Sequence, residues 1–131
     1  MQGLFSRLLI NLFVDLNQIY KISKPVIMTR KILAVLDVRL AIEKSNPPNI
    51  FIVARGEVNT TGWSDGQLVP FTYTTPPDDG IYEFDFVAKP PSGIFGQMIS
   101  PINSEYVWHN FPNDVKGIRI YASRNSISSD L

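Results

Sequence analysis

Hydrophobic and polar residues alternate with a period of two over several short stretches of this chain. Such alternation places the apolar side chains on one face of a β-strand and the polar side chains on the other. It is clearest in residues 32–43, 50–58, 81–89 and 115–123, which we predict to be strands. Their apolar faces predict a core. The predicted core positions are Leu36, Val38, Leu40, Ile42, Ile52, Phe84, Phe86, Ile118 and Ile120.

Turn-forming residues separate these stretches. Asn46-Pro47-Pro48 follows the first stretch, and Asp79-Gly80 precedes the third. Proline and glycine at this spacing favour tight connections between short strands. Together with strands at residues 67–74, 97–99 and 105–108, the pattern is typical of a two-sheet antiparallel sandwich, immunoglobulin-like, or of a small barrel. We predict one all-β domain of six to seven strands over residues 28–123, followed by a flexible tail at residues 124–131.

Residues 1–27 follow a different pattern, because apolar residues recur at helical spacing between Leu4 and Ile19. The spacing predicts an amphipathic helix. Polar residues interrupt the run too often for a secretory signal, and the run is too short to span a bilayer. Three interpretations stay open: a helix that packs on the domain, a helix at a membrane surface, or an extension outside the native protein. The third arises because Met28, directly before the first strand, is an alternative start.

Composition and charge exclude several classes of function. Twelve basic and twelve acidic residues cancel, so no net field attracts nucleic acid or an anionic membrane. The chain has no cysteine, which removes disulfides, thiol nucleophiles and thiolate metal sites. It also lacks a glycine-rich phosphate loop. We therefore expect no cofactor, metal, nucleic acid or membrane partner. We expect a cytoplasmic protein whose partner is another protein or a neutral small molecule.

The residues that could support catalysis are few. His109 is the single histidine, and no Gly-x-Ser-x-Gly motif accompanies it, so a nucleophile and base are not recognisable. Glu83 and Asp85 would lie about 7 Å apart on one strand face, a spacing that occurs in glycoside hydrolases and equally on ordinary exposed strands. Asp78 and Asp79 are explained by a turn. We predict that the protein is not an enzyme, with a carboxylate-based hydrolase as the alternative.

Aromatic residues in or near the predicted loops suggest where a partner would bind. Loops on a rigid β scaffold are the usual place for recognition, although loop aromatic residues also close the ends of a sandwich. We predict a binding or interaction module that uses its end loops, with Trp63, Asp65 and Trp108 as the contact surface. This surface requires that the loops at residues 60–66 and 108–112 lie at the same end.

Two stretches carry a resemblance to a known family. They are GEVNTTGW at residues 56–63 and PPDDGIYEFDF at residues 76–86. Both resemble a family of small uncharacterised bacterial β proteins, and the likeness covers about a third of the chain together with Leu68-Val69-Pro70. It implies a compact bacterial domain and carries no function.

A second resemblance is to the chagasin-type inhibitors of cysteine proteases, which are immunoglobulin-like sandwiches. Asn59-Thr60-Thr61-Gly62 resembles their inhibitory loop but lacks its proline. Residues 93–96 are similar to their glycine-rich loop, whereas the Arg-Pro-Trp element has no counterpart because Trp108 follows Val107. The resemblance implies a protease inhibitor as an alternative function.

Overall fold

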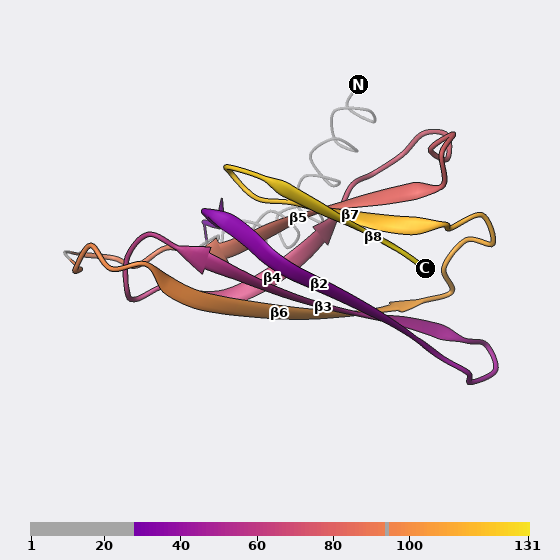
Figure 1. Ribbon diagram of the computed structural model, residues 1–131, viewed down its shortest axis with the longest axis horizontal. Coiled ribbons are helices and arrows are strands. Elements are labelled where there is room, and N and C mark those ends of the chain that lie inside the picture. The colour runs from indigo at the N-terminus through magenta and orange to yellow at the C-terminus, as the bar shows by residue number, and fades with distance from the viewer. Residues whose placement is uncertain (1–27, 94) are drawn as a thin grey trace, which may run out of the picture.

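The chain forms two packed β-sheets, as a computed structural model that describes residues 28–93 and 95–131 shows (Figure 1). The described residues contain no helix, and the two sheets do not close into a barrel. The prediction of an all-β sandwich is therefore confirmed, with eight strands in place of six or seven. The extension predicted at residues 1–27, with its helix between Leu4 and Ile19, lies outside the described residues. The strands are β1 (Arg30–Lys31), β2 (Ala34–Glu43), β3 (Asn49–Val58), β4 (Ser64–Pro70), β5 (Ile81–Lys89), β6 (Ser100–His109), β7 (Gly117–Tyr121) and β8 (Ser126–Asp130).

The smaller sheet has three strands in the order β2-β3-β6, all antiparallel. The predicted turn at Asn46-Pro47-Pro48 joins β2 and β3 into a hairpin, and β6 pairs with every residue of β3. β6 therefore extends beyond the strand predicted at residues 105–108. Residues 97–99, which were also predicted as a strand, belong to no strand.

β5 is the central strand of the larger, five-stranded sheet. β4 pairs with one edge of β5 and β7 with the other, and β8 pairs with β7. β1 continues the line of β7 along the same edge of β5. β5 and β7 are parallel, unlike the wholly antiparallel prediction, because the chain crosses to the other sheet as β6 and returns in the direction of β5. The flexible tail predicted at residues 124–131 is wrong, because β8 is held there by its ladder to β7.

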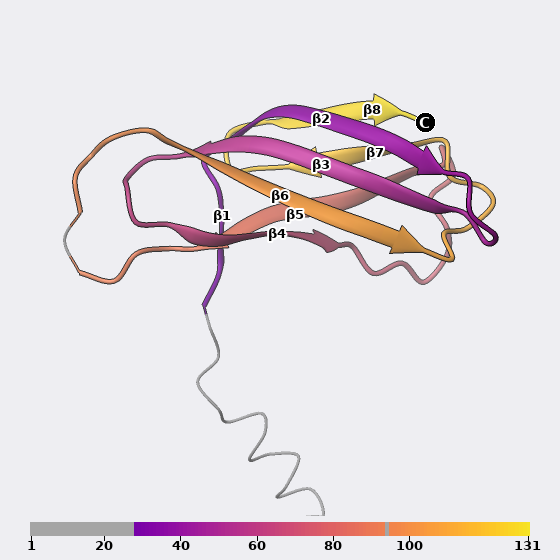
Figure 2. The same ribbon diagram turned by 90° about the horizontal axis from the view of Figure 1, so that it is seen from below.

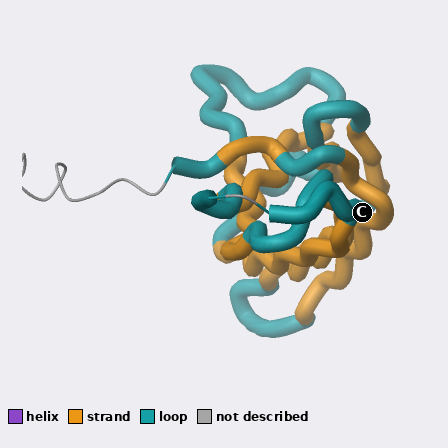
Figure 3. Tube along the Cα trace, turned by 90° about the vertical axis from the view of Figure 1, so that its left-hand side faces the viewer, coloured by secondary structure: helices purple, strands orange, loops and turns teal. Residues whose placement is uncertain are grey.

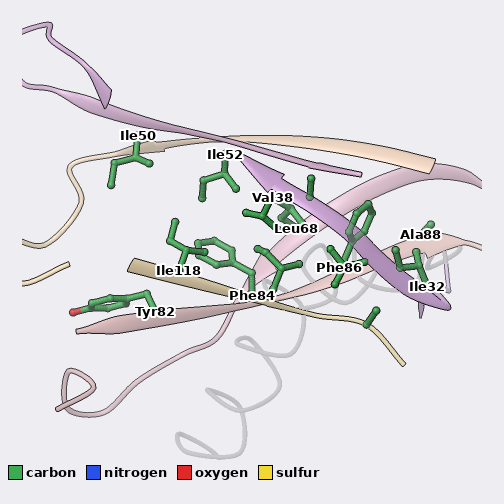
Figure 4. Close-up of a cluster of buried hydrophobic side chains, with 14 of the residues drawn as sticks. Ile32, Val38, Ile50, Ile52, Leu68, Tyr82, Phe84, Phe86, Ala88 and Ile118 are labelled. Carbon is green, nitrogen blue, oxygen red and sulfur yellow. The ribbon is translucent and has the colours of Figure 1, made fainter. Parts of the chain in front are cut away.

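The core fills the space between the two sheets (Figure 4). Apolar side chains of β3 and β5 alternate inward, as the sequence predicted. Six predicted core positions are buried: Val38, Ile52, Phe84, Phe86, Ile118 and Ile120. Leu40 is half-buried and packs against this core. The inner side chains of both sheets are therefore the main source of the buried apolar area that stabilises the fold.

Two predicted core positions are wrong, each for a local reason. Leu36 is exposed because the register between β2 and β3 shifts between Val35 and Asp37. Such a β-bulge adds one residue to a strand and turns its side chain away from the core. Ile42 lies near the end of β2, where the residues around it are exposed too. Alternation along a strand therefore predicts burial only where the ladder is regular and the other sheet covers the strand.

Polar contacts join the two sheets along both sides of the sandwich. On one side, the hydroxyl of Ser104 in β6 donates to the carbonyl oxygen of Gly66 in β4, at 3.0 Å. On the other side, the amide side chain of Asn125 accepts from the backbone N–H of Val35 and donates to its carbonyl oxygen, both at 2.8 Å. Asn125 thus satisfies backbone groups at the free edge of β2, which would otherwise be open to pairing with another strand.

Candidate functional site

The connections between the strands gather at two opposite ends of the sandwich (Figures 1 and 2). One end carries the β2–β3, β4–β5 and β6–β7 connections. The other end, toward the viewer in Figure 3, carries the β3–β4 and β5–β6 connections. A ligand that contacts one end therefore leaves the loops of the other end free.

The structure separates the two tryptophans of the predicted contact surface. Trp63 directly precedes Ser64, which pairs with Lys89 at the end of β5. Trp108 packs against Tyr82 near the start of β5, with ring centroids 5.4 Å apart. Tyr82 and Lys89 are roughly 23 Å apart along an extended strand. The prediction that Trp63, Asp65 and Trp108 form one surface is therefore wrong, since pairing places them at opposite ends.

Trp63 is half-buried and has a structural role at its own end. Its indole N–H donates to the hydroxyl of Thr60 at 2.9 Å, and its ring packs against the core. Asp65 is exposed, with a left-handed φ of 55°, at the register shift of β4. A small hollow of about 180 Å³ lies beside the indole but excludes Asp65. It is lined by Arg30, Lys31, Leu33, Asn59, Trp63 and Ser123.

The loops that resemble a protease inhibitor also lie at this end. The N–H of Thr61 is 3.4 Å from the carbonyl oxygen of Gly96, so the β3–β4 and β5–β6 connections touch. Gly62 has a φ of 90°, which glycine adopts without strain. The inhibitor hypothesis stays a prediction, because contact between two loops is not a protease-binding geometry.

Trp108 belongs to an aromatic cluster at the opposite end of the sandwich. Its ring meets Tyr82 and Phe84 edge to face and lies 6.2 Å from the ring of Phe111. Tyr82 is fixed in turn, because its hydroxyl donates to Asp114 at 2.9 Å. Burial, more than this hydrogen bond, raises the pKa of Tyr82 above its ordinary value. The cluster gives the loops of this end a rigid support.

A hollow of about 290 Å³ lies beside this aromatic cluster, and we call it the larger hollow. None of the described residues that line it is charged. Asn110 has a left-handed φ of 52°, a conformation that asparagine tolerates better than most residues. Two prolines of the β2–β3 connection also line it. The lining residues are Pro47, Pro48, Asn110, Phe111 and Asn113.

Strand pairing and hydrogen bonds hold the loops around the larger hollow in place. The register pairs Asn49 at the start of β3 with His109 at the end of β6, so the β2–β3 and β6–β7 connections leave the sheet side by side. The Oδ1 of Asn49 is 2.7 Å from the Nδ1 of His109, and its amide nitrogen donates to Glu43 at 2.9 Å. The N–H of Lys116 bonds to the β4–β5 connection at 2.8 Å. His109 thus has a structural partner near the hollow.

The carboxylates of β5 are engaged in contacts on the outer face of the larger sheet. Glu83 accepts hydrogen bonds from the hydroxyls of Tyr121 at 2.5 Å and Tyr73 at 3.1 Å, and lies 3.5 Å from the guanidinium of Arg119. Asp85 lies 3.4 Å from the ammonium of Lys31. The sequence left an ordinary exposed strand face as one interpretation of Glu83 and Asp85, whereas the structure shows a half-buried network. Neither carboxylate lines either of the two hollows, so their arrangement favours a structural role.

The same network perturbs its ionisable groups. Burial is the main cause that raises the pKa of Tyr73; the backbone N–H of Glu83, which donates to the hydroxyl, lowers this pKa, and the carboxylate of Glu83 raises it. The hydroxyl of Tyr121 is the main cause that raises the pKa of Arg119, so the guanidinium stays charged beside Glu83. A neutral tyrosine and a charged arginine are the states that stabilise the Glu83 carboxylate.

Asp79 has the turn role that the sequence predicted. Asp79 accepts the N–H of Ile81 at 2.9 Å, as expected for a turn. Across residues 28–93 and 95–131, no three His, Cys, Asp or Glu side chains are grouped as metal ligands. No helix in that same part of the chain could cross a membrane.

No known protein family, curated protein or solved structure matches this chain. The function is therefore argued from geometry, and both resemblances of the sequence stay predictions.

The sequence places Pro47 and Pro48 in a turn and Phe111 in the predicted loop at residues 108–112, but it does not bring these residues together. The signal that could have connected them is the concentration of asparagine and proline in both connections. Their proximity follows only from the pairing of Asn49 with His109, which the sequence does not show.

Proposed function

We propose that the protein is a non-catalytic binding module whose ligand sits in the larger hollow, among Pro47, Pro48, Asn110, Phe111 and Asn113. The observation that carries this proposal is the uncharged lining of the hollow, held against a rigid aromatic cluster. Concave sites with apolar walls and a few placed polar groups are typical binding sites. Loops on a β scaffold are a usual place for them.

The chemistry of the lining points to a neutral ligand. A charged ligand would lose its hydration without gaining an opposite charge, which is unfavourable. The side chains of Asn110 and Asn113 offer both donors and acceptors, as hydroxyl groups do. The ring of Phe111 and the two prolines offer apolar faces. A neutral saccharide ring combines hydroxyl edges with an apolar C–H face, so we propose saccharides as the ligand class.

The size of the hollow sets the expected affinity. At about 290 Å³ it lies at the lower limit of ordinary ligand pockets. Such a site holds one ring of an oligosaccharide and leaves the remaining rings in solvent. We therefore expect weak binding, with dissociation constants between millimolar and micromolar.

Binding of the full chain to a panel of neutral oligosaccharides of glucose, galactose, mannose and N-acetylglucosamine tests the proposal. Phe111→Ala should weaken binding about tenfold, because the ring supplies the main apolar face. Asn113→Asp should also weaken it, because an ionised aspartate keeps the size of asparagine but replaces its N–H donors with an acceptor. Asn113 is exposed, so the added charge should not destabilise the fold. The matched control is Phe95→Ala at the opposite end, where 42% of the side chain is exposed.

Two results would contradict the proposal. One is the absence of binding to every member of the panel. The other is binding that Phe95→Ala reduces and the Phe111 and Asn113 variants do not.

A further inference from the structure

The outer face of the β2-β3-β6 sheet carries an apolar patch that no described residue covers. Ile50 and Ile52 are fully buried on the inner face, so alternation turns Phe51 and Val53 outward. The exposed fractions are 37% for Phe51, 38% for Val53 and 43% for Val107 on the neighbouring strand. Exposed apolar side chains that cluster in this way mark interaction surfaces. We call Ala41, Phe51, Val53 and Val107 the outer patch.

The register arranges this face in rows across the three strands. Ala41, Phe51 and Val107 form one row, and all three are apolar. In the next row Val53 lies between Arg39 on β2 and Glu105 on β6. In this row the face is thus positive on β2, apolar on β3 and negative on β6.

Polar and charged residues lie on both sides of the apolar row along the strands. Beyond the apolar row lies the bonded row of Glu43, Asn49 and His109. At the other end Arg55 lies beside Asp37, with the two charged groups 3.9 Å apart. An apolar centre with a polar rim is the usual anatomy of a protein–protein interface.

We propose that the outer patch binds the outer patch of a second copy of this chain, about a two-fold axis parallel to β3. Rotation about this axis places β2 of one copy over β6 of the other. Arg39 then faces Glu105 of the second copy, and Glu105 faces its Arg39, so both charged pairs are complementary. Phe51 and Val53 meet their own copies at the axis. A two-fold interface must be self-complementary in this manner.

The geometry of the two strands leaves these charges available. Arg39 contacts Asp37 at 3.0 Å but keeps 79% of its side chain exposed. Glu105 is exposed and forms no salt bridge with the residues that the structure describes. Two sheets that pack face to face keep their strands within about 30° of each other. The shared strand direction that this axis requires is therefore an ordinary packing.

The size of the face predicts a weak dimer. Three strands of ten residues cover roughly 400 Å² per copy, from the spacing of strands and residues. Stable interfaces bury about 800 Å² per partner. We therefore expect a dimer that forms at high protein concentration and separates on dilution.

Sedimentation equilibrium of the full chain tests the proposal. The wild type should show a concentration-dependent mixture of monomer and dimer. Arg39→Glu makes both ends of the Arg39–Val53–Glu105 row acidic and Glu105→Arg makes both ends basic, so each variant alone should dimerise about tenfold more weakly. An equal mixture of the two variants should regain dimers, because the two acidic ends of the row in one variant then face the two basic ends of the row in the other.

The control is Arg124→Glu, an exposed charge reversal outside the face, which should leave the dimer unchanged. Phe51→Lys should abolish the dimer while the circular dichroism spectrum stays that of the wild type. The proposal is overturned if the wild type is monomeric at every concentration, as it would be with residues 1–27 covering the patch. It is overturned equally if the mixed variants associate no better than either one alone.

Discussion

Replacing Phe84 by alanine should lower the free energy of unfolding by about 3–5 kcal/mol. Phe84 lies on β5, the central strand of the larger sheet, and is 1% exposed. Its ring meets Tyr106 and Trp108 edge to face, with centroids 5.3 and 5.6 Å apart. The substitution removes these contacts and leaves a cavity that the two rigid sheets cannot close. Because a domain of this size is stable by only about 5–15 kcal/mol, the loss is a large part of its total stability.

Urea denaturation of the full chain measures the effect. The matched control is Phe71→Ala, because Phe71 is 38% exposed and stacks on Tyr121 on the outer face. The same deletion there should cost less than about 1 kcal/mol. Equal losses for the two variants would show that the larger sheet does not bury Phe84 as described.

Replacing Gly56 by alanine should also destabilise the domain, by about 2–3 kcal/mol. Gly56 is buried in β3 and lies opposite Val35, next to the bulge of β2. A Cβ at this position would overlap Cδ1 of Ile32 and come within 2.7 Å of the carbonyl oxygen of Ala34. Ile32 is fully buried, so neither neighbour can move without disturbing the core.

Thermal unfolding compares this variant with Gly96→Ala, which should melt like the wild type. A Cβ at Gly96 would have no atom within 4 Å. A melting temperature for Gly56→Ala equal to that of the wild type would contradict the close approach of β3 to the chain around Ile32.

The fold followed from the sequence where local alternation and burial agree. On β5, Tyr82, Phe84 and Phe86 alternate with carboxylates, and all three aromatic side chains are buried. Leu36 carries the same pattern but is exposed, because the bulge depends on how β2 pairs with β3. Residues 126–130 carry no strand pattern, yet the ladder to β7 makes them a strand. Pairing between distant segments decides such positions, and one sequence does not record it.

The candidate site was less predictable for the same reason. Trp63 and Trp108 were correctly placed in or near loops, but only the strand register separates them to opposite ends. Phe111 and Pro47 are distant in sequence and meet because Asn49 pairs with His109. The charged row beside the outer patch depends on register as well, because Arg39 and Glu105 both pair with Val53 from the two neighbouring strands.

The two tryptophans distinguish ligand binding at the end with the larger hollow from binding at the opposite end. Each end of the sandwich contains one indole: Trp108 contacts Phe111, while Trp63 donates to Thr60 at the other end. Both indole N–H signals can be followed by NMR while the full chain is titrated with the best-binding oligosaccharide of the panel. We predict that the Trp108 signal shifts progressively with ligand and that the Trp63 signal stays in place. A shift of the Trp63 signal with an unchanged Trp108 signal would contradict the proposed site.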